Sequence, residues 1–180
     1  MDQLSDEGCR PLDPESVYPG NRHVLAYWQS LRAGRALPSR AHFDPSRVSR
    51  SLSRLMVVQV WPGERIVCRL AGTAIVHMVG MELTGSDIVA NTPPEFRRER
   101  LARYSNCMDG FLHRAERMPL GASGAAIRAE HLILPFADLR EDGSRLALLT
   151  ADWVAPFDEQ FMSAASAFDA PDVSEYIALR

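Results

Sequence analysis

Hydrophobic residues recur at two different spacings along the chain, and these spacings separate predicted helices from predicted strands. Close to the N-terminus, apolar side chains stand at positions i, i+3, i+4 and i+7, which is the pattern of one buried helical face. That stripe consists of Val24, Tyr27, Trp28 and Leu31. It predicts a helix over 21–34, with Asn21 able to cap its start and Gly34 closing its end.

Two segments with strand character follow, and three more stand near the other end of the chain. The segment 55–61 is rich in valine, and 65–71 places Ile66, Cys68 and Leu70 on one face. A Pro-Gly-Glu turn joins the two segments, so they are predicted to form a hairpin. The three later strands are expected over 117–121, 125–136 and 145–155.

The pattern between the two groups of strands is helical. A short helix is expected over 73–80 and a long one over 93–113, where two prolines suit the unpaired N–H positions of a first turn. A short helix or turn at 46–54 precedes the first strand. The leading strands must then pair with the trailing ones across a helical insert. This order predicts an α+β fold, a five-stranded antiparallel sheet with helices on one face and an extra N-terminal helix.

The two ends of the chain lack this periodicity. Residues 1–20 are rich in proline and acidic residues and are expected to form a flexible arm, and 156–180 is an Ala- and Asp-rich tail without a strong pattern. A chain of 180 residues with 46% hydrophobic content suits one core better than two. One domain is therefore expected over 21–155. Two glycines, Gly72 and Gly85, are expected at positions where a β-carbon is awkward.

Charge and composition exclude several classes of function. The formal net charge is −3, so no global basic field favours a nucleic-acid partner. All 20 basic residues are arginine, which excludes Schiff-base and P-loop lysine chemistry. The cluster of arginines over 97–103 alternates with glutamates, which favours a solvated helix face. No apolar run has the length of a membrane helix and no signal peptide is recognisable, so we expect a cytoplasmic protein with no membrane association.

Motifs that would indicate catalysis or metal binding are absent from the sequence. Its three cysteines, Cys9, Cys68 and Cys107, form no CxxC pair, and the last two are expected to be small buried residues. The histidines lack metal-ligand spacing, and only His77 and His113 stand where a haem ligand is reasonable. Asp152 is interpreted as an outward polar residue of the last strand. We therefore expect no enzyme activity, no catalytic residues, no metal and no cofactor.

Three segments resemble a known family. The segment 26–45 is similar to the opening of a proteobacterial single-domain PAS family (PAS_5-like), 69–85 resembles the stretch after its second strand, and 130–136 resembles its fourth strand with an apolar-Pro ending. The matching positions of the opening are Tyr27, Trp28, Leu31, Arg32, Gly34, Arg35, Pro38, Arg40, Asp44 and Pro45. The resemblance implies a PAS fold across roughly 24–155. It implies no catalytic residues, because members of this family are largely uncharacterised.

The fold and the resemblance together predict a sensory or protein-interaction PAS module in bacterial signalling, with no output domain in the chain. The alternative is a small-ligand-binding protein or an enzyme that uses the same cavity. That cavity is expected between the inner face of the sheet and the short helices, where an unknown small molecule would bind, unless side chains fill it. The candidate ligand-binding residues are Cys68, Leu70, His77, Met78, Met81, Met108, Ile133 and Trp153.

The N-terminal apolar stripe must be buried by some partner surface. It can pack on the outer face of its own sheet, or against the same helix of a second chain. We expect a homodimer, because symmetric pairs are the commonest soluble assembly and aromatic residues suit interface cores. The expected interface residues are Val24, Tyr27, Trp28 and Leu31. The signal would then pass through this dimer or to a signalling protein partner.

Overall fold

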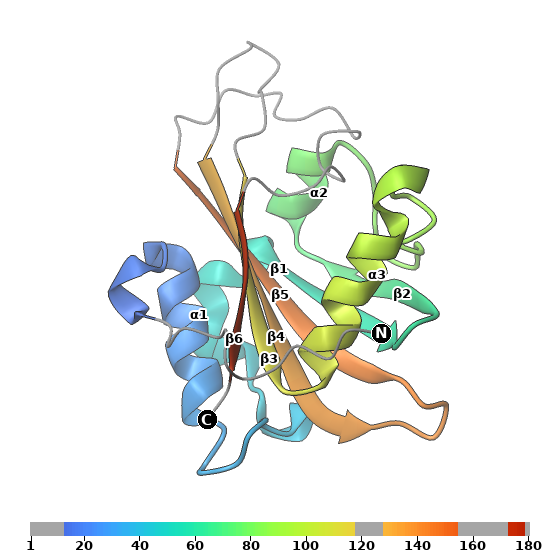
Figure 1. Cartoon of the computed structure of the whole chain (residues 1–180). Coiled ribbons are helices and arrows are strands. Elements are labelled where there is room, and N and C mark those ends of the chain that lie inside the picture. Colours follow the sequence, from blue (N-terminus) through green and yellow to red (C-terminus); the bar gives the residue numbers. More distant parts are fainter. Residues whose placement is uncertain (1–12, 118–127, 155–172, 179–180) are drawn as a thin grey trace.

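An antiparallel β-sheet forms the centre of the fold, and helices cover both of its faces (Figure 1). The computed structural model describes residues 13–117, 128–154 and 173–178. The strands in these ranges are β1 (Leu55–Trp61), β2 (Arg65–Ala71), β3 (Phe111–Arg117), β4 (Arg128–Leu139), β5 (Arg145–Val154) and β6 (Val173–Ala178). Their order across the sheet is β2-β1-β5-β4-β3-β6, and every neighbouring pair is antiparallel.

Five of these strands, with their antiparallel pairing, confirm the predicted α+β fold. The bounds of β1 and β2 are those predicted, whereas β3 begins at Phe111 rather than at 117. The reason is that the preceding helix α3 (Pro94–Met108) ends earlier than expected, and Gly110, with a φ of 101°, turns the chain into the strand. The apolar residues after that glycine therefore belong to the sheet, although their spacing also fits the end of a helix.

The sequence analysis missed the edge strand β6. It lies within 156–180, which we expected to be an irregular tail, and it pairs with β3. Its register places Ile177 opposite Leu112, and both side chains are buried beneath the outer face of the sheet. A strand of six residues has few alternating positions, so its periodicity is weak. The described part of the tail thus belongs to the domain.

Different helices cover the two faces of the sheet, and each face has its own hydrophobic core. The covering helices are α1 (Pro19–Ser30), the 3-10 helix η4 (Pro45–Arg54), α2 (Thr73–Val79) and α3. We name the face covered by α2 and α3 the inner face and the face covered by α1 and η4 the outer face (Figure 1). Alternation along the strands separates the side chains, so that Ile133 and Leu149 enter the inner core whereas Leu132 and Leu148 enter the outer core.

The N-terminal helix packs against its own sheet. Val24 and Trp28 are completely buried in the outer core, and Tyr27 and Leu31 pack against it. Burial within one chain is the first of the two alternatives considered for this stripe. Val24 and Trp28 therefore have no surface left to offer a second chain, whereas the expected interface role of the partly exposed Tyr27 and Leu31 stays a prediction.

The predicted ends of this helix also need correction. It runs over Pro19–Ser30 rather than 21–34, with Tyr18 at the N-cap position. Asn21 does not cap the helix but lies inside its first turn, completely buried against the sheet. The chain turns away through Ala33 and Gly34, both of which have positive φ.

The two glycines singled out in the sequence occupy the restricted positions expected of them. Gly85 has a φ of 84°, in the left-handed region that L side chains rarely adopt. Gly72 lies directly against the backbone at the end of η4, and a β-carbon there would stand 2.4 Å from the carbonyl oxygen of Ser53. This close approach lets η4, β2 and α2 meet without a gap.

We expect Gly72→Ala to lower the free energy of unfolding by about 3 kcal/mol, because the added methyl group meets backbone that cannot rotate away. Gly85→Ala is the matched control. It has open space around Cα, so it should cost only about 1 kcal/mol of backbone strain. Urea denaturation of both variants measures the difference, and equal costs would show that the close contact at Gly72 is readily relieved.

Candidate functional site

The inner core brings together most of the predicted ligand-binding residues. Cys68, Met78, Met108, Ile133 and Trp153 are all buried in this one cluster. Met81 is partly buried and packs against its edge. The grouping of these six side chains is confirmed, whereas their binding of a ligand stays a prediction.

Two of the predicted ligand-binding residues lie on the surface instead. Leu70 is 52% exposed, because β2 contains a bulge: Val57 pairs with Leu70 and Val58 with Cys68, so the residue between them has no partner in the register. A bulge interrupts alternation, and Leu70 no longer shares the face of Cys68. His77 is exposed on α2, whose other side carries the buried residues. Neither side chain can line an interior cavity.

The two described cysteines are buried, as predicted, and chemically protected. Burial raises the pKa of the Cys68 thiol to about 11. Burial also raises the pKa of the Cys107 thiol, strongly, since that side chain is completely enclosed between α3 and the sheet. Thiols rather than thiolates are therefore present at neutral pH, and neither side chain is a nucleophile. Cys9 lies outside the described residues.

Several polar residues occupy positions different from those expected. His113 lies on β3 rather than on the long helix, and it is buried on the inner face opposite Ile133. Arg100 and Arg103 were assigned to a solvated helix face, yet both are buried on α3. Arg103 reaches Glu99 one turn earlier, with 2.5 Å between Nη2 and Oε1. A long arginine side chain can cover apolar surface while its head group stays paired, which explains why the charge pattern was misleading.

The outer face carries a buried polar network beneath the start of α1. Its centre is Glu130 on β4, which is completely buried. One carboxylate oxygen accepts a hydrogen bond from Nε of Arg114 at 2.7 Å. The other accepts from Nδ2 of Asn21 at 2.9 Å and from the backbone N–H of Tyr18 at 3.0 Å. The carboxylate therefore binds the first turn of α1 to the sheet.

Asp152 on β5 makes a second, parallel attachment. It faces Glu130 across the β4–β5 register. Its Oδ2 accepts a hydrogen bond from the backbone N–H of Gly20 at 2.8 Å, and its Oδ1 is paired with Nη1 of Arg54. A β-carbon at Gly20 would stand 2.8 Å from Oδ2, so glycine is what allows this approach. Two carboxylates thus accept hydrogen bonds from the first turn of a helix, where negative charge is favoured.

Arg54 connects this network with the inner core. Its guanidinium group pairs with Asp152 and also lies over the ring of Trp153, 4.4 Å from the ring centre. The backbone N–H of Trp153 in turn donates to Oδ1 of Asp152 at 3.0 Å. Trp153 belongs to the inner core, whereas Asp152 belongs to the outer network. These three residues therefore form a contact between the two faces of the sheet.

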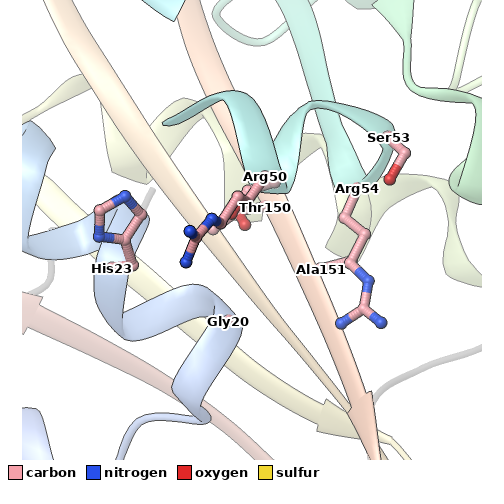
Figure 2. A pocket seen from close by; sticks show the side chains of 8 residues that line it. Gly20, His23, Arg50, Ser53, Arg54, Thr150 and Ala151 are labelled. Carbon is pink, nitrogen blue, oxygen red and sulfur yellow. The ribbon is translucent and has the colours of Figure 1, made fainter. Parts of the chain in front are cut away.

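A pocket opens beside this network, on the outer face of the sheet. Its volume is about 460 Å³, and it lies between α1, η4 and β5 (Figure 2). Figure 2 shows Arg50 and Arg54 extending from η4, with His23 and Gly20 on α1 across from them. The lining residues are Gly20, His23, Arg50, Ser51, Ser53, Arg54, Thr150 and Ala151. None of them was singled out from the sequence as a site residue.

The fold and its sequence agree with a known class of sensory domain. Two antiparallel strands, a helical segment and three further strands define the PAS architecture, and the family model PAS_5, described as a PAS domain, matches residues 17–150. The chain therefore belongs to this family. Searches of curated proteins and of solved structures gave no significant match.

The described ranges of the chain show neither a metal-binding cluster nor a membrane-spanning helix. Within them, no group of three or more His, Cys, Asp or Glu side chains is placed to hold a metal ion. None of the helices in those ranges has both the length and the apolar character needed to cross a membrane.

Sequence analysis missed Glu130 and interpreted Asp152 as an outward polar residue, which is wrong because Asp152 is only 6% exposed. The sequence did contain one usable signal. Glu130 and Asp152 are ionisable residues within strands that are otherwise mostly apolar. An acid in such a strand either faces solvent or is buried with partners, and burial without partners is very unfavourable. The arginines Arg54 and Arg114 were available as those partners, but nothing local in the sequence links them to the acids.

We expect Glu130→Gln to lower the free energy of unfolding by about 3 kcal/mol, because it removes the buried carboxylate charge that pairs with the largely buried Arg114. Glu15→Gln is the matched control, since Glu15 pairs with Arg22 on the surface and its side chain is 80% exposed. That change should cost less than about 1 kcal/mol. Urea denaturation of both variants is the measurement, and similar small losses would show that the Glu130 network does not stabilise the fold.

Proposed function

We propose that this chain is a sensory or protein-interaction PAS module in bacterial signalling, and that α1 is its output element. One observation carries the proposal: Arg54 contacts both Trp153 of the inner core and Asp152, which holds the first turn of α1. A change in the inner core therefore has a short physical route to the helix on the opposite face.

The first step of that route is the packing of Trp153. Its ring lies in the inner core with Met78, Met108 and Ile133, where a small molecule or a partner would act. Displacement of the ring changes the support for the Arg54 guanidinium that stacks on it. Methionines repack readily around a new guest, so this core suits an adaptable sensor.

The second step is a change in the hydrogen bond by which Asp152 holds the first turn of α1. Arg54 and the backbone N–H of Gly20 approach the same carboxylate, on Oδ1 and Oδ2 respectively. Hydrogen bonds weaken steeply as their geometry departs from the optimum, so a small shift of the carboxylate changes its hold on α1. Two arrangements of α1 that differ in free energy by a few kcal/mol are sufficient for a signal.

The finer parts of the proposal rest on family membership and on the sequence. The protein acts without catalysis or a bound cofactor, in the cytoplasm of a proteobacterium, as a single PAS domain. It assembles as a homodimer and passes its signal to a protein partner. A small molecule of unknown identity serves as the input.

Hydrogen exchange tests the route from Trp153 to α1. We expect Trp153→Phe to accelerate exchange of the Gly20 amide several-fold, because the smaller ring supports Arg54 less well. The matched control is Trp61→Phe, since Trp61 also has an arginine over its ring, Arg65, with 4.1 Å to the ring centre. That control should leave the Gly20 amide unchanged relative to amides of the central strands. Unchanged Gly20 exchange in Trp153→Phe, or equal acceleration in both variants, would contradict the relay.

The homodimer requires an interface other than the buried part of the α1 stripe. A double substitution of Tyr27 and Trp28 would disrupt the outer core, so the informative change is Ala26→Glu on the exposed side of α1. Ala102→Glu on the exposed side of α3 is the control. We expect light scattering to show a dimer for wild type at high micromolar concentration and dissociation only for Ala26→Glu. A monomeric wild type overturns the dimer, and a dimeric Ala26→Glu variant removes the outer side of α1 from its interface.

A further inference from the structure

The pocket between α1 and η4 is rich in groups that bind anions. Its described lining contains two arginines and a histidine but no carboxylate. The nearby Asp152 is already matched by Arg54 and by the N–H of Gly20. The remaining positive charge, that of Arg50, has no acidic counterpart among the lining residues. The pocket is therefore positive overall.

Arg50 is the group most available to a ligand. Its side chain is exposed at the pocket, and it makes no hydrogen bond or ion pair with any residue that the structure describes. Figure 2 shows its guanidinium group reaching from η4 toward α1, on the side where His23 stands. The Nε2 atom of His23 is 3.2 Å from the carbonyl oxygen of Arg47, which fixes the ring at this edge.

Hydroxyl groups line the same pocket. Ser51 is only 8% exposed, and Ser53 follows it on η4. Neither hydroxyl forms a hydrogen bond within the described residues. Both residues line the pocket, so their hydroxyls are available to donate hydrogen bonds to a ligand there. The Thr150 hydroxyl already donates to Asn21 at 2.8 Å, so it is left as an acceptor.

We propose that this pocket binds a small phosphate-bearing molecule. The guanidinium of Arg50 and the hydroxyls of Ser51 and Ser53 are the phosphate ligands, since together they offer more donors than the two oxygens of a carboxylate can use. The volume of about 460 Å³ greatly exceeds that of a phosphate ion and lies within the range of small-molecule sites. The rest of the molecule occupies the part lined by Gly20 and Ala151.

Such a ligand would join the two elements that cover the outer face. Gly20 and His23 come from α1, whereas Arg50, Ser51 and Ser53 come from η4. A molecule that contacts both elements favours the state in which α1 is docked on the sheet, and it raises the melting temperature by mass action. The binding itself does not depend on the proposed sensory role, because it requires neither the inner core nor a dimer.

Titration of the full chain with inorganic phosphate and with glycerol 3-phosphate tests the proposal. The ionic strength is held constant with sodium chloride, and acetate serves as the carboxylate probe. We expect saturable changes in the amide NMR signals of Gly20, Ser51 and Ala151 at millimolar phosphate, with tighter binding of glycerol 3-phosphate. Acetate should give no saturable change. Acetate binding as tight as phosphate binding, or no saturation by either phosphate, overturns the proposal.

Three variants locate the site. Arg50→Gln should weaken phosphate binding about tenfold or more, and Ser51→Ala several-fold, with an unchanged fold in both cases. Arg98→Gln removes the same charge from the exposed side of α3 on the opposite face, and it should bind as wild type does. Equal losses in Arg50→Gln and Arg98→Gln would reveal a general charge effect and overturn the site. Binding to phosphatidic acid vesicles without binding of glycerol 3-phosphate would identify a lipid surface and likewise overturn it.

Discussion

The position of α1 depends on two carboxylates that the sheet buries beneath its first turn. Glu130 and Asp152 are direct neighbours on β4 and β5, and like charges in such positions repel. Removing them from water is also unfavourable unless hydrogen bonds and opposite charges compensate. Arg114, Arg54 and the first-turn amides of α1 supply that compensation. The buried acids therefore need the hydrogen-bond donors of α1, and α1 in turn needs the acids to hold its first turn on the sheet.

Apolar and polar contacts make different contributions to this docking. The burial of Val24 and Trp28 supplies most of the apolar area, but hydrophobic contact is non-directional and would tolerate several placements of the helix. The two acids and Thr150 select one placement, because each accepts or donates at a fixed point of the first turn. Hydrophobic contact thus holds α1 on the sheet, and the polar contacts fix its position there.

The sequence predicted what local periodicity determines. The bounds of β1 and β2 and the apolar stripe of α1 follow from repeats of two and 3.6 residues, which need no tertiary information. The predictions were wrong where contacts with distant parts of the chain determine whether a side chain is buried or exposed. The hydrogen bond from Gly20 to Asp152 joins residues 132 positions apart, so the burial of that acid was not visible locally. The bulge that exposes Leu70 likewise depends on its pairing with β1.

The alternation of the central strands has an evolutionary consequence. On β4 and β5, residues such as Ile133 and Leu149 face one core while their immediate neighbours Leu132 and Leu148 face the other. Substitutions can therefore accumulate on one side of the sheet without direct contact with the other side. The side chains of the inner core can therefore change during evolution while the N-terminal helix stays docked in the same position on the outer face. This independence of the two faces ends at Trp153, because a substitution there alters contacts on both faces of the sheet.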